Sequence, residues 1–200
     1  MCSFLLRWRG LAVLFFVLWL GGPRAARAQA KYMTRVGHIS FFSVSIMEDI
    51  EARNDKVAAV FDLGTGQVAF SVPVHEFQFK RTLMQEHFNE NYLESEKFPK
   101  ATFVGQVNNI GQVARLVGTT TQNVEVEGNL TMHGVTRKVL ITGTLKVRDG
   151  QLVAFAYFNI APADFNIDVP RLVREHIAKS VSVSVNLSCD PVGSALVSRP

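Results

Sequence analysis

The residues of this chain best suited to chemistry are its histidines, one internal cysteine and a pair of late aspartates. The five histidines show no metal-ligand spacing; they are His38, His75, His87, His133 and His176. Asp164 and Asp168 flank Asn166, but without the rest of a calcium loop a turn is the expected role. The sequence has neither a nucleophile elbow nor a phosphate-binding glycine loop. It therefore predicts no catalytic residue, no cofactor and no metal site.

The first 28 residues are typical of a secretory signal peptide. Arg7 and Arg9 precede an unbroken apolar run from Leu11 to Leu20, and Ala26-Arg27-Ala28 is a small-x-small cleavage site. The run is too short to span a bilayer, which takes about 20 apolar residues. We expect residues 1–28 to be removed, leaving an exported domain over residues 32–190 that has no membrane span. A disordered tail is expected over residues 191–200.

Charge and cysteine content argue against a nucleic-acid-binding protein and against a disulfide-stabilised one. Four of the 21 basic residues and no acidic residue lie in the signal segment, so the remainder carries 17 of each and is close to neutral. The sequence thus gives no support to nucleic-acid binding. Cys189 would be the only cysteine left, so no disulfide can form within the chain. A disulfide-free exported domain favours the bacterial periplasm, or secretion, and Cys189 is expected to be buried.

The most regular pattern runs from Gln122 to Val147. Apolar residues fall on even positions up to Met132 and on odd positions from Val139, which predicts two antiparallel strands with one apolar face. Pairing even with odd positions requires a loop with an even number of residues. A two-residue turn at His133-Gly134 and a four-residue loop over residues 133–136 both satisfy this requirement.

The rest of the chain supplies the further strands and one helix. Residues 32–46 (with Val36, Ile39 and Phe41 as anchors), 57–63 and 68–74 are expected strands, with a bend near residues 73–76. A helix is expected over residues 81–93, where Met84, Phe88 and Tyr92 share a face with Leu83 and His87. Later strands are expected at residues 101–107, 112–118, 152–160 and 177–189. The strand at residues 152–160 is apolar at both parities, which predicts burial on both sides.

The predicted fold is all-β and antiparallel, with about eight strands and one or two short helices. A sandwich and a barrel both fit, but long strands favour a closed barrel with room for its own side chains or one small ligand. Gly128 and Gly143 lie in the apolar phase of the hairpin. They either allow sharp curvature or leave interior space unfilled.

Three segments together resemble the YceI-like family. They are Glu96-Lys97-Phe98-Pro99-Lys100-Ala101-Thr102-Phe103, Gly128-Asn129-Leu130-Thr131-Met132-His133-Gly134-Val135-Thr136 and Ala163-Asp164-Phe165-Asn166-Ile167. The resemblance implies an exported, eight-stranded lipocalin-like barrel that binds a polyisoprenoid or another lipid. The family usually has a basic residue before Asp-Phe-Gly, whereas Pro162 and Asn166 stand in that region here.

The hypothesis favoured by these observations is a non-enzymatic carrier of an apolar lipid. The expected cavity lining is Val68, Phe70, Val72, Val124, Val126, Leu130, Ile141, Leu145, Val181, Val183 and Val185. His87 and Tyr92, and less directly His133, are candidates for the cavity mouth and a ligand head group. Two alternatives stay open: a barrel enzyme acting on an apolar substrate, and an exported structural domain with a filled core.

Overall fold

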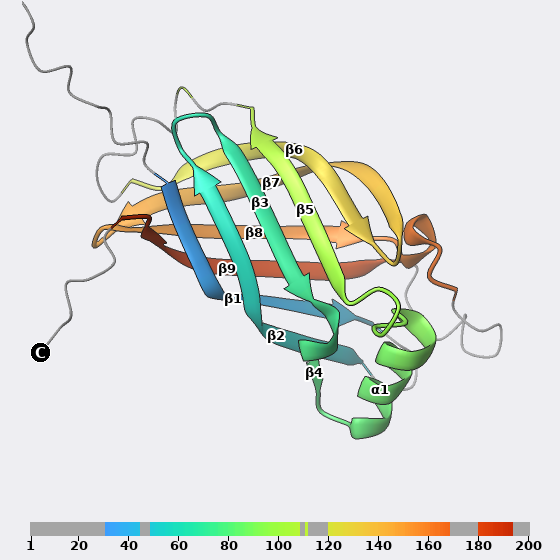
Figure 1. Cartoon of the computed structure of the whole chain (residues 1–200). Helices are drawn as coiled ribbons and strands as arrows, with labels where there is room; N and C mark the ends of the chain where they lie inside the picture. The colour runs from blue at the N-terminus through green and yellow to red at the C-terminus, as the bar shows by residue number, and fades with distance from the viewer. Residues whose placement is uncertain (1–30, 45–48, 109–110, 112–119, 169–179, 194–200) are drawn as a thin grey trace, which may run out of the picture.

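The structure is a closed antiparallel β-barrel of eight long strands, with one helical segment at its end (Figure 1). This computed structural model describes residues 31–44, 49–108, 111, 120–168 and 180–193. Around the barrel the strands follow the order β1-β9-β8-β7-β6-β5-β3-β2, and pairing of β1 with β2 closes the ring. The strands are β1 (Lys31–Ser43), β2 (Ile50–Asp62), β3 (Gln67–Pro73), β4 (Gln78–Phe79), β5 (Lys100–Val107), β6 (Gln122–Met132), β7 (Val135–Arg148), β8 (Gln151–Ile160) and β9 (Val181–Pro191).

The helical part follows β3, where the chain turns across the end of the barrel. A short 3-10 turn, η1 (Val74–Glu76), leads to β4, which pairs with β2 at Ala52 and Arg53. Helix α1 (Thr82–His87) then continues into a π-helical turn, η2 (Phe88–Tyr92). A second 3-10 turn, η3 (Pro162–Phe165), follows β8. The predicted bend near residues 73–76 and the helix over residues 81–93 are both confirmed, although Leu83 is exposed and lies off the predicted apolar face.

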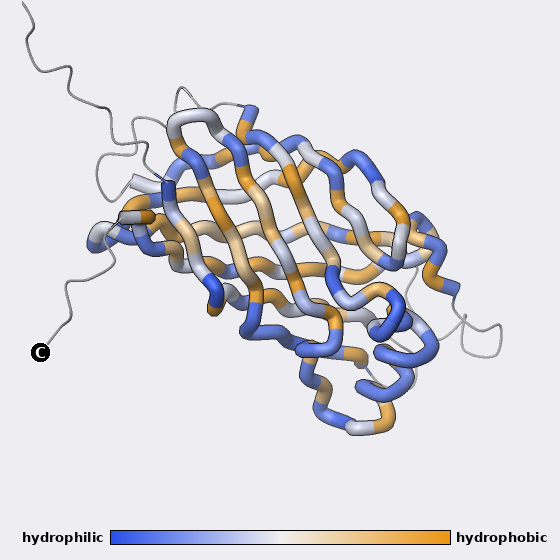
Figure 2. The backbone as a smooth tube through the Cα atoms, in the orientation of Figure 1, coloured by the Kyte–Doolittle hydropathy of each residue, from blue (hydrophilic) through white to orange (hydrophobic). Residues whose placement is uncertain are grey.

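The hairpin of β6 and β7 has the two-residue turn. Met132 pairs with Val135, which leaves His133 and Gly134 as the loop, with φ of 51° and 75°. Positive φ at both central residues is the type I′ geometry that matches strand twist. The four-residue loop is therefore excluded, and Leu130 lies opposite Arg137. Alternating apolar and polar residues along the strands are visible in Figure 2.

Three expectations about individual strands were wrong. In β1 the register shifts on both sides of Gly37, and this bulge turns Val36 out to solvent with 76% of its surface exposed. In β8 the odd positions face outward, so Phe155 and Tyr157 are exposed and the strand is buried on one side only. Strand β2 begins at Ile50, seven residues before the predicted start.

The early part of β2 has no apolar periodicity because its interior position Asn54 is polar. Its side chain is fully buried and satisfied: Nδ2 donates to the Pro73 carbonyl at 2.7 Å, and Oδ1 accepts from the Lys56 N–H at 2.8 Å. The expected strand over residues 112–118, the signal peptide and most of the predicted tail lie outside the described residues. Within the described part of the chain, no helix is long and apolar enough to cross a membrane.

Candidate functional site

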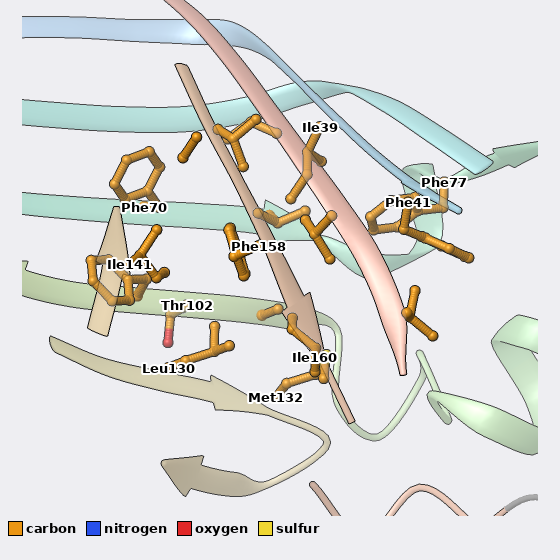
Figure 3. Close-up of a pocket in the computed structure, with 18 of the residues that line it drawn as sticks. Ile39, Phe41, Phe70, Phe77, Thr102, Leu130, Met132, Ile141, Phe158 and Ile160 are labelled. Atoms are coloured by element: carbon orange, nitrogen blue, oxygen red, sulfur yellow. The ribbon is translucent and has the colours of Figure 1, made fainter. Parts of the chain in front are cut away.

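The barrel encloses a cavity of about 520 Å³ whose lining is almost entirely apolar. Side chains from opposite walls converge on it, and Figure 3 shows Phe70, Ile141, Phe158 and Ile160 among them. All eleven residues predicted to line a cavity do so. Their inward direction follows from strand alternation, since residues that pair across neighbouring strands share a face.

One end of the barrel is closed by tight packing. Leu152 and Cys189 pair across β8 and β9 and are both 0% exposed, and Leu145, Leu187 and Val107 are also buried around them. Cys189 is a free thiol, as predicted, and burial raises its pKa to about 12, with a smaller contribution from neighbouring Asp190. A thiol that stays protonated in an apolar core is structural rather than reactive.

The inward residues become more accessible toward the opposite end. Along β6, Val124 is buried, whereas Val126, Leu130 and Met132 keep partial exposure although they face the barrel interior. Strand β9 starts likewise with the partly exposed Val181, and the fully buried Cys189 lies near its other end. The accessible surface of these residues belongs to the cavity, which therefore opens at the end where α1, η2 and η3 lie (Figure 1).

Small residues in the wall help to leave the space open. Gly143 pairs with Ala156, and both line the cavity together with Ala154. Neither glycine has open space where a Cβ would stand. A Cβ on Gly143 would lie 2.5 Å from the backbone oxygen of Phe155, and one on Gly128 would lie 2.6 Å from Cζ of Phe103. Both glycines thus permit a close approach of neighbouring strands, and Gly143 also borders the cavity.

A cluster of four phenylalanines forms the wall beside the helix. Phe41, Phe77, Phe79 and Phe88 pack with ring centroids 5.0–5.8 Å apart, and all four line the cavity. Sequence reasoning did not assign these residues to the cavity, because they come from β1, from β4 and the residue before it, and from the helical segment, whose contact is purely tertiary. Phe158 and Ile160 were also missed, although their even spacing with Ala154 and Ala156 was the available signal.

Two of the three predicted mouth residues lie at the cavity. His87 and Tyr92 line it from the helical segment, and burial raises the pKa of Tyr92, so its phenol stays neutral. Ser43, on β1, is another polar lining residue at this end, as is Thr102 at the start of β5; Ser43 is only 3% exposed, and its Oγ has no hydrogen-bond partner. Of the described lining residues, none is Asp, Glu, Lys or Arg.

His133 is not a lining residue. Its Nε2 lies 2.8 Å from Oε2 of Glu94, and its Nδ1 lies 3.2 Å from the carbonyl oxygen of Phe165. The ring of Phe98 packs edge-on against the imidazole, with 4.7 Å between the two ring centroids. His133 therefore ties the hairpin turn to the segment after η2 and to η3.

The three sequence motifs meet at this histidine. Phe98 belongs to the first motif, His133 to the second and Phe165 to the third, and Arg137 Nε adds a 2.8 Å hydrogen bond to the carbonyl oxygen of Asp164. Asn166 caps η3 in the left-handed region at φ 55°, a conformation that asparagine tolerates better than most residues. The motifs thus build a structural junction beside the cavity mouth. Among the described residues, no group of three or more His, Cys, Asp or Glu side chains is placed to hold a metal.

Comparison with solved structures supports the fold assignment. A polyisoprenoid-binding domain from Saccharophagus degradans, implicated in plant cell wall breakdown, aligns with 82% of this chain and 99% of its own, at 16% identity and a TM-score of 0.70. BcnA from Burkholderia cenocepacia aligns with 76% of this chain and 95% of its own, at 19% identity and a TM-score of 0.64. At such identities the likeness shows a shared fold.

The family follows from the sequence itself. No curated protein matches the chain. The model of the YceI-like domain, however, matches residues 27–189, which include the whole described barrel except the end of β9. The three motifs that meet around His133 lie inside that match. The chain belongs to the YceI-like family.

Proposed function

We propose that this protein binds and carries one apolar lipid, of the polyisoprenoid class, inside its barrel. The observation that carries the proposal is the apolar cavity of about 520 Å³, closed at the Leu152 end and open at the helical end. Its volume lies in the range of about 300–1,000 Å³ that is usual for ligand sites. Branched aliphatic and phenylalanine side chains along its wall suit a methyl-branched chain.

The cavity size sets the length of chain that can be enclosed. At about 30 Å³ for a water-sized group, 520 Å³ holds roughly 17 such groups, the size of a prenyl chain of about 15 to 20 carbons. Each buried methylene contributes about 0.8 kcal/mol, against an association cost of about 4–15 kcal/mol. The free energy of burying a ten-carbon chain thus exceeds that cost by little at best. Burying a chain of about 20 carbons contributes roughly twice as much free energy as burying ten carbons.

A non-enzymatic role is part of the proposal. General acid–base catalysis needs a positioned proton donor or acceptor, and nucleophilic catalysis needs an activated side chain. The described lining offers His87 and Tyr92 as its titratable groups, and burial keeps Tyr92 neutral. Export to the bacterial periplasm completes the proposal and is supported by the signal-like first 28 residues.

The first test is mass spectrometry of an organic extract from the protein purified without detergent from its native compartment. The expected result is one prenyl lipid per protein molecule. The second test is binding of prenyl alcohols of 10, 15, 20 and 40 carbons, measured by displacement of a fluorescent prenyl probe. Both tryptophans, Trp8 and Trp19, lie in the expected signal segment, so intrinsic tryptophan fluorescence would not report on the exported protein. Affinity should rise steeply to about 20 carbons and then level off, because further carbons leave the cavity.

Adjacent residues of β7 provide a matched control. Ile141 lines the cavity, while Leu140, its neighbour on the opposite face, is 60% exposed. Ile141→Trp should fill part of the cavity and weaken binding of the 20-carbon alcohol at least tenfold. Leu140→Trp should leave binding unchanged. An empty protein that binds no prenyl alcohol, or equal effects of the two substitutions, would overturn the proposal.

A further inference from the structure

Among the described residues that line the cavity, Ser43 is the one whose buried side-chain polar atom has no hydrogen-bond partner. Its hydroxyl lies on the inward face of β1, two residues after Phe41, and it pairs in register with Ile50, which also lines the cavity. Across the described residues, Ser43 Oγ and Asn89 Oδ1 are the two buried side-chain polar atoms that lack a hydrogen bond, and Asn89 lies outside the lining. Buried hydroxyls are normally satisfied, so an unpaired one calls for an explanation.

Bound water is a poor partner for this hydroxyl. An ordered water in a protein interior typically makes about three hydrogen bonds to polar groups. Ser43 stands instead beside apolar lining residues, with Ile50 opposite it and Phe41 on the same face of its own strand. An oxygen atom carried into the cavity by an apolar ligand needs only the single bond that Ser43 can supply. A serine hydroxyl both donates and accepts, so it suits an alcohol, a carbonyl or an ether oxygen.

The surroundings also decide the charge of that oxygen function. The described lining has no lysine or arginine to pair with a phosphate. Two ion pairs from the elements at this end, Glu51 with Lys80 at 2.9 Å and Glu94 with Lys97 at 3.8 Å, are solvent-exposed, and in each pair the two charges already balance one another. Moving an unpaired ionised group into an apolar site is strongly unfavourable. A charged head group would therefore have to stay outside, away from Ser43.

We propose that Ser43 is the polar anchor of the bound lipid, and that the lipid carries an uncharged oxygen function next to it. This inference rests on the proposed function, since it names the part of the ligand that the cavity recognises. Ser43 belongs to the more open end of the barrel, where β1 ends and β9 begins. The oxygen function is thus held near the mouth, and the hydrocarbon chain extends toward Leu152 and Cys189.

The test compares three 20-carbon probes on the exported protein. They are geranylgeraniol, the hydrocarbon of the same skeleton with methyl in place of CH2OH, and geranylgeranyl diphosphate. The wild-type protein should bind the alcohol about five- to tenfold more tightly than the hydrocarbon, as expected for one net hydrogen bond. The diphosphate should bind more weakly than the alcohol.

Ser43→Ala separates a ligand contact from a structural role. It should bring the alcohol-to-hydrocarbon ratio to about one by weakening the alcohol alone, because the folded protein loses no hydrogen bond of its own. Its thermal stability without ligand should be no lower than that of the wild type. Ser184→Ala, on the outer face of β9 where the hydroxyl accepts from Asn186 Nδ2 at 3.3 Å, should keep the wild-type ratio.

The outcomes distinguish the two proposals. A wild-type protein that binds neither alcohol nor hydrocarbon overturns the proposed function and the anchor together. Binding of both probes with the same ratio in wild type and Ser43→Ala overturns the anchor and leaves the lipid carrier standing. Diphosphate binding as tight as that of the alcohol overturns the uncharged oxygen function.

Discussion

Gly134→Ala is expected to destabilise the protein clearly more than Gly150→Ala, although the two glycines occupy equivalent backbone positions. Each is the second residue of a two-residue hairpin turn, Gly134 after His133 at φ 75° and Gly150 after Asp149 at φ 80°. An L residue in the left-handed region costs about 1–2 kcal/mol. This backbone term is common to both substitutions, so a comparison of the two removes it.

The surroundings of the two glycines differ. A Cβ on Gly134 would lie 2.7 Å from Cε1 of Phe98, whereas nothing lies within 4 Å of a Cβ on Gly150. Phe98 cannot move away without losing two contacts. One is its edge-on contact with His133, and the other is its contact with Lys97 Nζ, which lies 4.9 Å from the centroid of the Phe98 ring. Overpacking of this kind costs about 1–3 kcal/mol. We therefore expect a loss of about 2–5 kcal/mol for Gly134→Ala and about 1–2 kcal/mol for Gly150→Ala.

Urea unfolding followed by far-ultraviolet circular dichroism measures these losses. Phe98→Leu completes a double-mutant cycle: combined with Gly134→Ala, it should recover the excess loss, giving a coupling energy of about 1 kcal/mol or more. Combined with Gly150→Ala, it should show no coupling, because the two sites share no contact. Equal losses at the two glycines, or no coupling between Phe98 and Gly134, would refute the role assigned to the motif junction.

Three further predictions test other parts of the barrel. His133→Ala should lower the free energy of unfolding by about 1–3 kcal/mol, since it removes the ring that contacts both the Glu94 carboxylate and the Phe165 carbonyl; urea midpoints equal to the wild type would contradict this. Leu152→Ala, at the closed end, should cost about 2–5 kcal/mol, and Leu130→Ala clearly less because its side chain already borders open space; equal losses in denaturant would argue for a filled core. The pKa of about 12 for Cys189 lies above the value of the unfolded thiol, so stability should fall as pH rises from 9 to 12, by roughly 1 kcal/mol per pH unit. The free energy of unfolding of Cys189→Ala, measured in urea at pH 8 and pH 10.5, should lack this pH-dependent loss. A loss of stability as steep as in the wild type would contradict the assignment to Cys189.

The strands of the barrel and their inward faces were predictable because strand alternation is a local property. The even positions of β6 and the odd positions of β7 face inward in the structure as the sequence pattern required. The two-residue turn at His133-Gly134 was one of two loops allowed by parity alone. Where alternation fails, prediction fails with it: the bulge at Gly37 reverses the phase and exposes Val36.

The candidate site was predictable only in part. Every predicted lining residue faces the cavity, because inward direction follows from the alternation of each strand. The phenylalanine cluster was not predictable, since Phe41, Phe79 and Phe88 come from elements whose docking depends on the whole barrel. In β8 both the even and the odd positions are apolar, so the sequence did not show which face points inward; pairing with β9 decides it.

The sequence by itself determined antiparallel strands, their apolar face and the residues that form it, because period-two alternation is encoded residue by residue; long strands favoured a barrel over a sandwich, and the pairing of β1 with β2 decides for the barrel. Only the tertiary structure decided whether that face is packed or hollow, since a cavity depends on what lies opposite each side chain. Gly143 and Ala156 meet across two strands and border open space, whereas Leu152 and Cys189 meet across two strands and are completely buried. The same holds for His133. The sequence predicts its place in the turn, but its contacts with Glu94 and Phe165 depend on the folded barrel.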